Sequence, residues 1–313
     1  MTQFILILII LLIIFYSKYK KCKLPTNNLP INKGKIAFLF LTRDNINNYD
    51  IWTKFLQGED RYSIYVHPKY PEKVTQQLMK DNIINETTDT GWGTIGAVRA
   101  NLLLLKYALM DPNNKMFMLV SESCMPIQNF NKFYNFIFKD MKSYIPYFIE
   151  HTEKYNQIIN PKISRDQFRK HCAQGLIFNR THALLLTQND TTEDWKNVIY
   201  VDENYFYNNI IQHTFKNINK YKITFDIWSL IGRNGHNNDR DLKYFNYDIN
   251  SKLKMMPPTN SSSLQTFGEL NDEFINKMIK NGYYFMRKVD RECKFDNLKF
   301  HINWGNKNVF LSS

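Results

Sequence analysis

The chain has 313 residues, of which 43% are hydrophobic and 15% are aromatic, so it can bury the core of one large or two small α/β domains and is not a disordered polypeptide. Its 41 Lys and Arg against 29 Asp and Glu give a formal net charge of +12. This excess favours an anionic partner such as a nucleotide or a membrane surface. The sequence lacks long basic runs, zinc-finger spacing and RNP-type strands, which argues against a nucleic-acid partner.

The N-terminal segment is the most apolar part of the chain. Every residue from Phe4 to Tyr16 is apolar or aromatic, and lysines follow at once. A helix of this length reaches about 20 Å, whereas a hydrocarbon core is about 30 Å thick, so residues 1–19 would all have to contribute. No small-residue cleavage site follows. We therefore predict an uncleaved membrane anchor over 1–19, a short stem over 20–33 and one globular domain over 34–313.

The first half of the globular region alternates between two periodicities. Apolar runs rich in aromatic and β-branched residues predict strands over 35–42, 62–66 and 116–120. Between them, the spacing of apolar residues predicts helices over 49–56 and 94–110. This alternation indicates a largely parallel sheet that is covered on both faces.

The second half carries shorter patterns and one polar loop. The loop, over 232–241, is rich in Asn and Gly. The predicted elements are a strand over 174–178, a helix over 180–186, a helix over 202–213, a helix over 271–281 that ends at Gly282, and a strand through Tyr284 and Phe285.

Four cysteines are spread along the chain without metal-binding spacing. Cys22, Cys124, Cys172 and Cys293 form no C-x-x-C pair and have no accompanying pair of histidines. A structural zinc site is therefore not expected. Disulfides remain open, and the spacing does not say which cysteines would pair.

The residues that follow the predicted strands are the candidates for ligand binding, because ligands in open α/β sheets lie beyond the carboxyl ends of the strands. These residues include Arg43, His67 and the tripeptide Ser121-Glu122-Ser123. A single carboxylate is a poor site for a hard cation. The only Asp-x-Asp, Asp239-Arg240-Asp241, lies in the polar loop and follows no apolar strand. We therefore expect no metal site.

Seven motifs in order resemble the core-2/I-branching β-1,6-N-acetylglucosaminyltransferase family, glycosyltransferase family 14, and in particular its plant-type branch. They are KIAFLFLTR from Lys35, YSIYVHP from Tyr62, WGTIGAVRANLLLL from Trp92, FMLVSESCMPI from Phe117, QGLIFNR from Gln174, VDENYF from Val201 and FMRKV from Phe285. The resemblance implies a GT-A-like nucleotide-diphospho-sugar transferase fold with a mostly parallel central sheet. It also implies an inverting transfer that needs no metal or other cofactor.

The resemblance assigns the central catalytic role to Glu203. The family's general base lies in an Asp-Glu-hydrophobic motif, which Asp202 and Glu203 match, whereas Asn204 departs from its third position. A single carboxylate on the face opposite the leaving group is what an inverting transfer requires. The competing interpretation is a carboxylate that only complements a helix dipole at the helix start.

Further binding roles also come from the resemblance. Arg287 and Lys288 match the basic residues that neutralise the donor diphosphate, and an ordinary basic surface pair is the alternative. Arg43, His67 and Glu122 are assigned to the donor pocket as well, although a structural histidine explains His67 equally well. Trp92 and Trp228 are candidate acceptor-binding residues, because aromatic rings stack on sugars, although isolated tryptophans are more often core.

The sequence thus predicts an enzyme that moves N-acetylglucosamine from UDP-N-acetylglucosamine to a hydroxyl of a glycan or glycoprotein. Xylosyl or glucuronosyl transfer is an alternative, as is a catalytically silent carbohydrate-binding protein of the same fold. A peripheral membrane- or nucleic-acid-binding protein is the third class. By resemblance the chain is a single-pass type II protein of the Golgi or another secretory membrane. The lysines after Tyr16 favour the opposite orientation, because positive flanks stay cytosolic.

Overall fold

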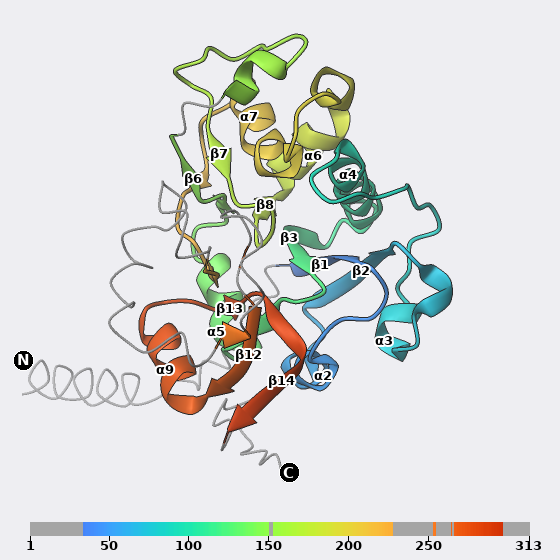
Figure 1. Cartoon of the computed structure of the whole chain (residues 1–313), viewed down its shortest axis with the longest axis vertical. Helices are drawn as coiled ribbons and strands as arrows, with labels where there is room; N and C mark the ends of the chain where they lie inside the picture. Colours follow the sequence, from blue (N-terminus) through green and yellow to red (C-terminus); the bar gives the residue numbers. More distant parts are fainter. Residues whose placement is uncertain (1–33, 150–152, 228–252, 255–263, 265, 297–313) are drawn as a thin grey trace, which may run out of the picture. The chain divides into compact units, whose positions relative to one another are not determined.

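The structure is a computed structural model that describes residues 34–149, 153–227, 253–254, 264 and 266–296 (Figure 1). The predicted anchor, the predicted stem, the 232–241 loop, Cys22 and Trp228 lie outside the described residues. Within the part of the chain that is described, no helix combines the length and the apolar character needed to cross a membrane.

A six-stranded sheet forms the centre of the domain. Its strand order is β2-β1-β3-β8-β5-β9. The strands β1, β2 and β3 are parallel to one another, and β5 is parallel to β9, whereas β8 runs antiparallel to both of its neighbours. This mixed, mostly parallel sheet fits the expected GT-A-like fold. The bounds are β1 (Lys35–Thr42), β2 (Tyr62–Pro68), β3 (Asn114–Ser121), β5 (Ser143–Tyr144), β8 (Ile177–Asn179) and β9 (Ile218–Asn219).

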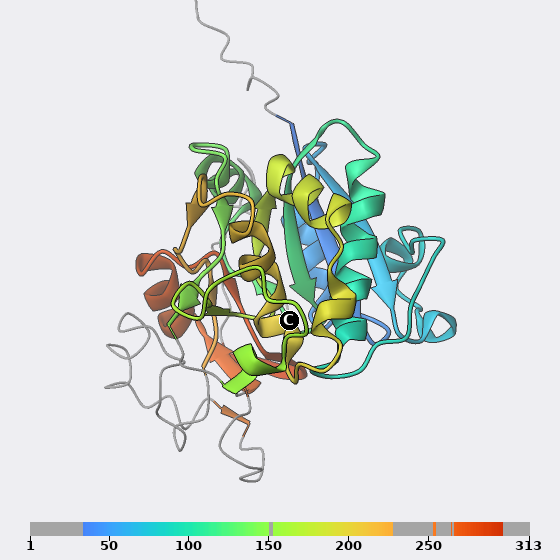
Figure 2. The ribbon, with the colours of Figure 1, turned by 90° about the horizontal axis from the view of Figure 1, so that it is seen from above.

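Strands β1 and β3 are buried on both faces, which explains their unbroken apolar sequences. Residues 36–40 of β1 and 116–120 of β3 are at most 1% exposed. Because successive side chains of a strand point to opposite faces, Leu39 packs into the core beneath α4 (Ile95–Leu109), whereas Phe38 packs beneath α2 (Tyr49–Leu56). The teal α4 and the yellow α6 (Arg180–Gln188) share one face of the sheet (Figure 2).

Most of the predicted elements are confirmed, with small shifts at their ends. The strands predicted at 62–66 and 116–120 are longer in the structure, and the helix predicted at 271–281 is α9 (Asp272–Lys280). Asparagine side chains cap the N-termini of several helices: for example, Asn179 accepts from the N–H of His182 in α6, and Asn271 accepts from that of Phe274 in α9. The strand predicted at 174–178 begins only at Ile177, because Gly175 adopts a left-handed φ of 77° that ends the extended backbone.

The prediction of one helix over 202–213 is wrong. A 3₁₀ turn, η4 (Val201–Glu203), is followed by a separate helix, α7 (Tyr205–Ile211). Asn204 separates them with a φ of −130° and donates its side-chain amide to the carbonyl of Tyr200 at 3.0 Å. Asparagine competes in this way with the helical backbone for hydrogen bonds. Glu203 therefore lies in a short turn ahead of the helix and not in its first turn.

Two three-stranded sheets bring the C-terminal region to the end of β3. Residues 287–288 connect strands of these two sheets, and the N–H of Val289 donates to the carbonyl of Ser123 at 2.9 Å. The predicted strand through Tyr284 and Phe285 is displaced by one residue. The first sheet is β10 (Thr224–Phe225), β13 (Phe285–Met286) and β4 (Met125–Pro126), and the second is β11 (Leu253–Lys254), β12 (Thr266–Asn271) and β14 (Val289–Asp296).

The remaining elements are short. Strands β6 and β7 form an antiparallel pair beside the cavity described below. Cys124, Cys172 and Cys293 are free thiols. The bounds are β6 (Tyr147–Phe148), β7 (Lys170–His171), α3 (Gln77–Lys80), α5 (Phe130–Ile137), η1 (Pro71–Lys73), η2 (Glu153–Gln157) and η3 (Thr192–Trp195).

Candidate active site

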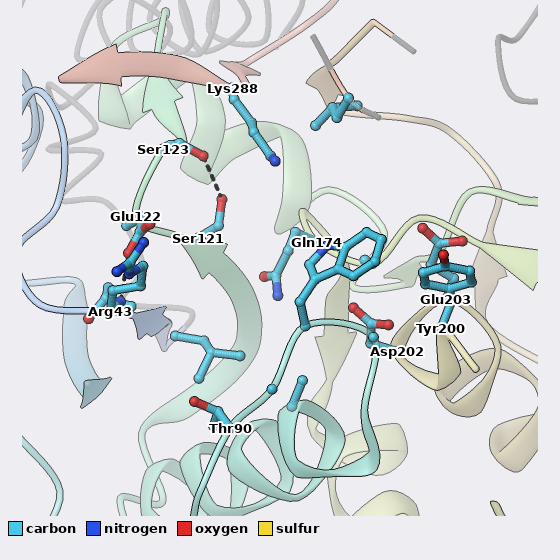
Figure 3. Close-up of a pocket in the computed structure, with 18 of the residues that line it drawn as sticks. Arg43, Thr90, Ser121, Glu122, Ser123, Gln174, Tyr200, Asp202, Glu203 and Lys288 are labelled. Atoms are coloured by element: carbon cyan, nitrogen blue, oxygen red, sulfur yellow. Dashed lines mark hydrogen bonds between the residues drawn. The ribbon is translucent and has the colours of Figure 1, made fainter. Parts of the chain in front are cut away.

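A cavity of about 560 Å³ opens at the carboxyl ends of β1, β2 and β3 (Figure 3). Its volume lies within the range of small-molecule sites. The cavity therefore lies at the sheet edge where the strand-end rule placed candidate residues. Its polar and charged lining comes from Thr42, Arg43, Lys69, Tyr70, Thr90, Ser121, Glu122, Ser123, Lys154, Lys170, Gln174, Tyr200, Asp202, Glu203, Arg287 and Lys288.

Glu122 is fixed against the end of β1. The backbone N–H of Arg43 donates to Oε2 of Glu122 at 2.6 Å, and the N–H of Asn47 donates to its carbonyl at 2.8 Å. On either side of Glu122, the hydroxyls of Ser121 and Ser123 lie 3.5 Å apart. This wall therefore presents two hydroxyls and one carboxylate that already accepts a hydrogen bond. Nowhere in the described ranges do three or more His, Cys, Asp or Glu side chains gather as a metal site would require.

Arg287 and Lys288 form the cationic wall. Arg287 is 8% exposed, and no group among the described residues accepts a hydrogen bond from its Nε. Its backbone N–H donates to the carbonyl of Phe225 at 2.8 Å, which holds the segment in place. Burial, and then the neighbouring Arg287 charge, lower the pKa of Lys288, while Glu122 opposes the shift. An anionic ligand bound here would offset the electrostatic repulsion between these two buried cations.

Asp202 and Glu203 lie across the pocket from Arg43 and Glu122 in the view of Figure 3. The Glu203 side chain is 12% exposed, and its Oε2 lies 3.1 Å from Nζ of Lys170. Burial, followed by the charge of Glu203, raises the pKa of Asp202 to about 6. The cavity is thus lined by two adjacent carboxylates, one of them ion-paired to Lys170, and by Arg287 and Lys288 from a different segment of the chain.

An aromatic pair stands at the rim of the cavity. Trp92 is 77% exposed and meets Tyr200 edge to face, with ring centroids 4.9 Å apart. Gly93 has a left-handed φ of 69°, and its carbonyl accepts from the N–H of Tyr200 at 2.9 Å. Nζ of Lys154 lies 4.8 Å from the centroid of the Tyr200 ring. This rim offers an exposed aromatic surface of the kind that packs on sugar rings.

The structure brings together six of the eight residues that the sequence singled out. Arg43, Trp92, Glu122, Glu203, Arg287 and Lys288 all line the cavity. His67 is not among the lining residues: it is fully buried, and its Nε2 accepts from the N–H of Thr88 at 2.9 Å. Burial lowers the pKa of His67, so the neutral ring is favoured there. Trp228 lies outside the described residues.

Three functional candidates escaped the sequence analysis. Tyr200 directly precedes the Val201-to-Phe206 motif, so its position next to that motif was a usable signal. Gln174 opens another motif, and its Oε1 is buried without a hydrogen-bond partner among the described residues. Lys170 lies in a strand of two residues that has no recognisable pattern, so nothing in the local sequence pointed to it.

Comparison with known proteins identifies the family of this chain. The sequence model of the Core-2/I-branching enzyme family matches residues 36–255, which is more than half of the chain. The chain is similar to glycosyltransferase BC10 of Oryza sativa subsp. japonica, with 30% identity over 170 residues. That match covers 52% of this chain and 42% of the rice protein, so the chain spans less than half the length of this relative.

Among solved structures, that of A197 from STIV aligns with 48% of this chain and 66% of its own, at 10% identity and a TM-score of 0.26, a likeness too low to inform the fold. The family model, by contrast, covers residues 36–255, which include the six-stranded sheet from Ile36 onward, the Ser-Glu-Ser wall and the Asp202-Glu203 turn. The resemblance found in the sequence is therefore confirmed, and the chain belongs to the Core-2/I-branching enzyme family.

Proposed function

We propose that this chain is an inverting glycosyltransferase that moves a sugar from a UDP-sugar to an acceptor hydroxyl, with Glu203 as general base and without a metal ion. The observation that supports the proposal is that one cavity is lined both by the cations Arg287 and Lys288 and by the adjacent carboxylates Asp202 and Glu203. The first suits a departing diphosphate and the second suits removal of a proton.

The cationic wall is the proposed diphosphate site. Lys288 and the buried Arg287 contribute fixed positive charge, and the hydroxyls of Ser121 and Ser123 can donate hydrogen bonds to phosphate oxygens. The Nε of Arg287 is a buried donor without a partner among the described residues, and such donors are rare unless a ligand completes them. In the proposed step the bond from the anomeric carbon to the phosphate oxygen breaks, and its electron pair leaves with UDP.

The part of the cavity lined by Asp202 and Glu203 is the proposed acceptor site. The acceptor oxygen forms the new bond to the anomeric carbon while its proton passes to a carboxylate oxygen of Glu203. Trp92 and Tyr200 at the rim would pack against the acceptor sugar. Asp202 is the neighbouring carboxylate, and its pKa of about 6 makes it the second candidate for the base.

We propose that the transfer needs no metal ion because the residues at the end of β3 offer too few carboxylates to bind one. The Ser-Glu-Ser wall supplies one carboxylate, and Oε2 of that carboxylate already accepts the N–H of Arg43. Mg²⁺ and similar cations need more oxygen ligands than this. Transfer should therefore continue in excess EDTA. Loss of activity in EDTA that manganese restores would contradict this part of the proposal and would make Asp239 and Asp241, outside the described residues, the next candidates.

The donor is proposed to be UDP-N-acetylglucosamine and the acceptor a glycan or glycoprotein, with xylosyl and glucuronosyl transfer as alternatives. We also propose the type II secretory membrane placement. Protease protection of the C-terminus in sealed microsomes would support this orientation. Digestion of the C-terminus without detergent would contradict it.

The deciding experiment measures UDP release from a panel of UDP-sugars by the wild type and two isosteric variants. Glu203→Gln keeps the shape of the side chain but cannot take up the proton, so turnover should fall by about 10² to 10⁴ while UDP still binds. Asp202→Asn is the matched control and should keep turnover within about tenfold. The reverse pattern would move the base to Asp202. UDP binding without turnover of any donor in the wild type would favour the silent carbohydrate-binding alternative.

A further inference from the structure

Lys170 places a buried cation against the proposed base. Its Nζ lies 3.1 Å from Oε2 of Glu203, and the two side chains are 7% and 12% exposed. Both side chains also line the cavity. A buried carboxylate whose partner is removed is left with an uncompensated charge, so this contact restrains the Glu203 side chain far more than an exposed ion pair would.

The backbone beside Lys170 is fastened to the same segment of chain that carries Glu203. The N–H of Arg169 donates to Oδ1 of Asn208 at 2.9 Å, and the Arg169 carbonyl accepts from Nδ2 of Asn208 at 2.6 Å. Asn208 lies in α7, directly after the turn that holds Glu203. This pair of hydrogen bonds fixes β7 relative to the base-bearing turn.

His171 makes the third contact between the two segments. Its Nε2 accepts the N–H of Phe206 at 3.1 Å, while Nδ1 lies 2.8 Å from the carbonyl of Cys172. These partners require a neutral ring with the proton on Nδ1. Burial lowers the pKa of His171 to about 4, so the ring keeps this state at neutral pH. Three consecutive residues, 169–171, thus each hold one residue of 203–208.

We propose that Lys170 is a positioning residue, which holds Oε2 of Glu203 so that Oε1 faces the acceptor hydroxyl. The inference rests on the proposed role of Glu203 as the base. The proposed diphosphate site is formed by Arg287 and Lys288, which line the cavity from a different segment of the chain than Lys170.

The test combines Lys170→Met with Lys170→Arg and with a matched control, Lys35→Met. Lys35 pairs with Asp111 at 3.4 Å, at the other end of β1 and away from the cavity. Lys170→Met should lower kcat by about a hundredfold, because a misplacement of ~1 Å can have such an effect. UDP affinity should stay within about twofold. Lys170→Arg should recover kcat to within about tenfold of wild type, and Lys35→Met should leave it unchanged.

A second comparison separates positioning from a general structural role. In the Glu203→Gln background, adding Lys170→Met should not lower the residual rate further, because the side chain that Lys170 positions no longer acts as a base. An additional hundredfold loss in that background, a loss of UDP affinity in Lys170→Met, or a wild-type kcat in Lys170→Met would each overturn the inference. If Lys170→Met does not fold, Lys170→Gln is judged by the same criteria.

The failure of this inference is distinguishable from that of the proposed function. If Glu203→Gln keeps wild-type turnover, the base is misassigned and both proposals fail. If Glu203→Gln loses turnover while Lys170→Met keeps it, only the positioning role of Lys170 fails.

Discussion

Replacing Trp52 with Phe tests how helix α2 supports the wall of the active-site cavity. Trp52 is fully buried, and its Nε1–H donates to the carbonyl of Cys124 at 2.9 Å. Its ring packs edge to face against Phe38 and Phe40, at centroid distances of 5.6 and 4.9 Å. Cys124 directly follows the Ser121-Glu122-Ser123 wall, so one hydrogen bond joins the core to the site.

The expected drop in the free energy of unfolding has two sources, a lost hydrogen bond and a new cavity. Phe has no N–H, so the buried carbonyl of Cys124 loses its donor, at a cost of about 1–3 kcal/mol. The smaller Phe ring also leaves a cavity. Truncation of a buried aromatic side chain to Ala costs about 3–5 kcal/mol. Because Phe keeps most of the packing contacts of Trp52, we assign about 1 kcal/mol to the cavity. The free energy of unfolding should therefore fall by about 2–4 kcal/mol, a large part of the 5–15 kcal/mol typical of a domain.

Urea denaturation followed by far-UV circular dichroism measures this change. Trp92→Phe is the matched control, because Trp92 is 77% exposed and the same substitution there should change stability by no more than about 0.5 kcal/mol. Equal effects at the two positions, or a loss below about 1 kcal/mol for Trp52→Phe, would refute the reasoning. UDP affinity should also weaken in Trp52→Phe, since the adjoining wall is no longer tied to α2.

Three further predictions concern the cavity itself. Gly93→Ala should lower the free energy of unfolding by about 1–2 kcal/mol, because the backbone there has a left-handed φ, and it should raise the acceptor KM, because the new Cβ would lie 2.8 Å from the ring of Tyr200. Gly58 has a similar φ but nothing within 4 Å, so Gly58→Ala should lower stability in thermal denaturation and leave the KM unchanged. The pKa of Asp202 rises from 3.8 to about 6 on folding, so the folded state holds the proton more tightly and wild-type stability should fall as pH rises from about 4 to about 6. Asp202→Asn should remove this dependence of stability on pH. Above pH 6 the variant should be about 1–2 kcal/mol more stable than wild type in urea titrations, because the partial exposure of the side chain reduces the full effect. An unchanged pH dependence would contradict the raised pKa of Asp202. Lys288→Ala should weaken UDP binding roughly tenfold to a hundredfold by calorimetry, and unchanged affinity would place the diphosphate elsewhere.

The long elements of the domain could be predicted because the way each one is buried leaves a regular pattern of apolar residues in its sequence. Helix α2 spans the predicted residues 49–56, and β1 spans 35–42. A strand buried on both faces needs an apolar residue at every position, and an amphipathic helix needs one on every turn, so both patterns are visible in the sequence. The strand-end rule then identified Arg43 and Ser121-Glu122-Ser123 as cavity residues, since parallel strands deliver their carboxyl ends to one edge.

Predictions from the local pattern of apolar residues failed where side-chain hydrogen bonds or contacts between distant residues decide the conformation. The helix expected over 202–213 is interrupted because Asn204 bonds to the carbonyl of Tyr200. His67 follows β2 as expected for a ligand-binding residue, but its ring accepts the N–H of Thr88 and is buried. Apolar periodicity carries no information about either hydrogen bond.

The sequence by itself therefore determined the family, the order of the main strands and helices, and six of the residues that line the cavity. The tertiary structure alone decided that Lys170 meets Glu203 and that Asp202 shares its wall with an ion-paired carboxylate. The physical reason is that the strength of an ion pair depends on burial and on the distance between two groups. Lys170 and Glu203 lie far apart in the chain, and only the docking of β7 against the turn before α7 brings them within 3.1 Å.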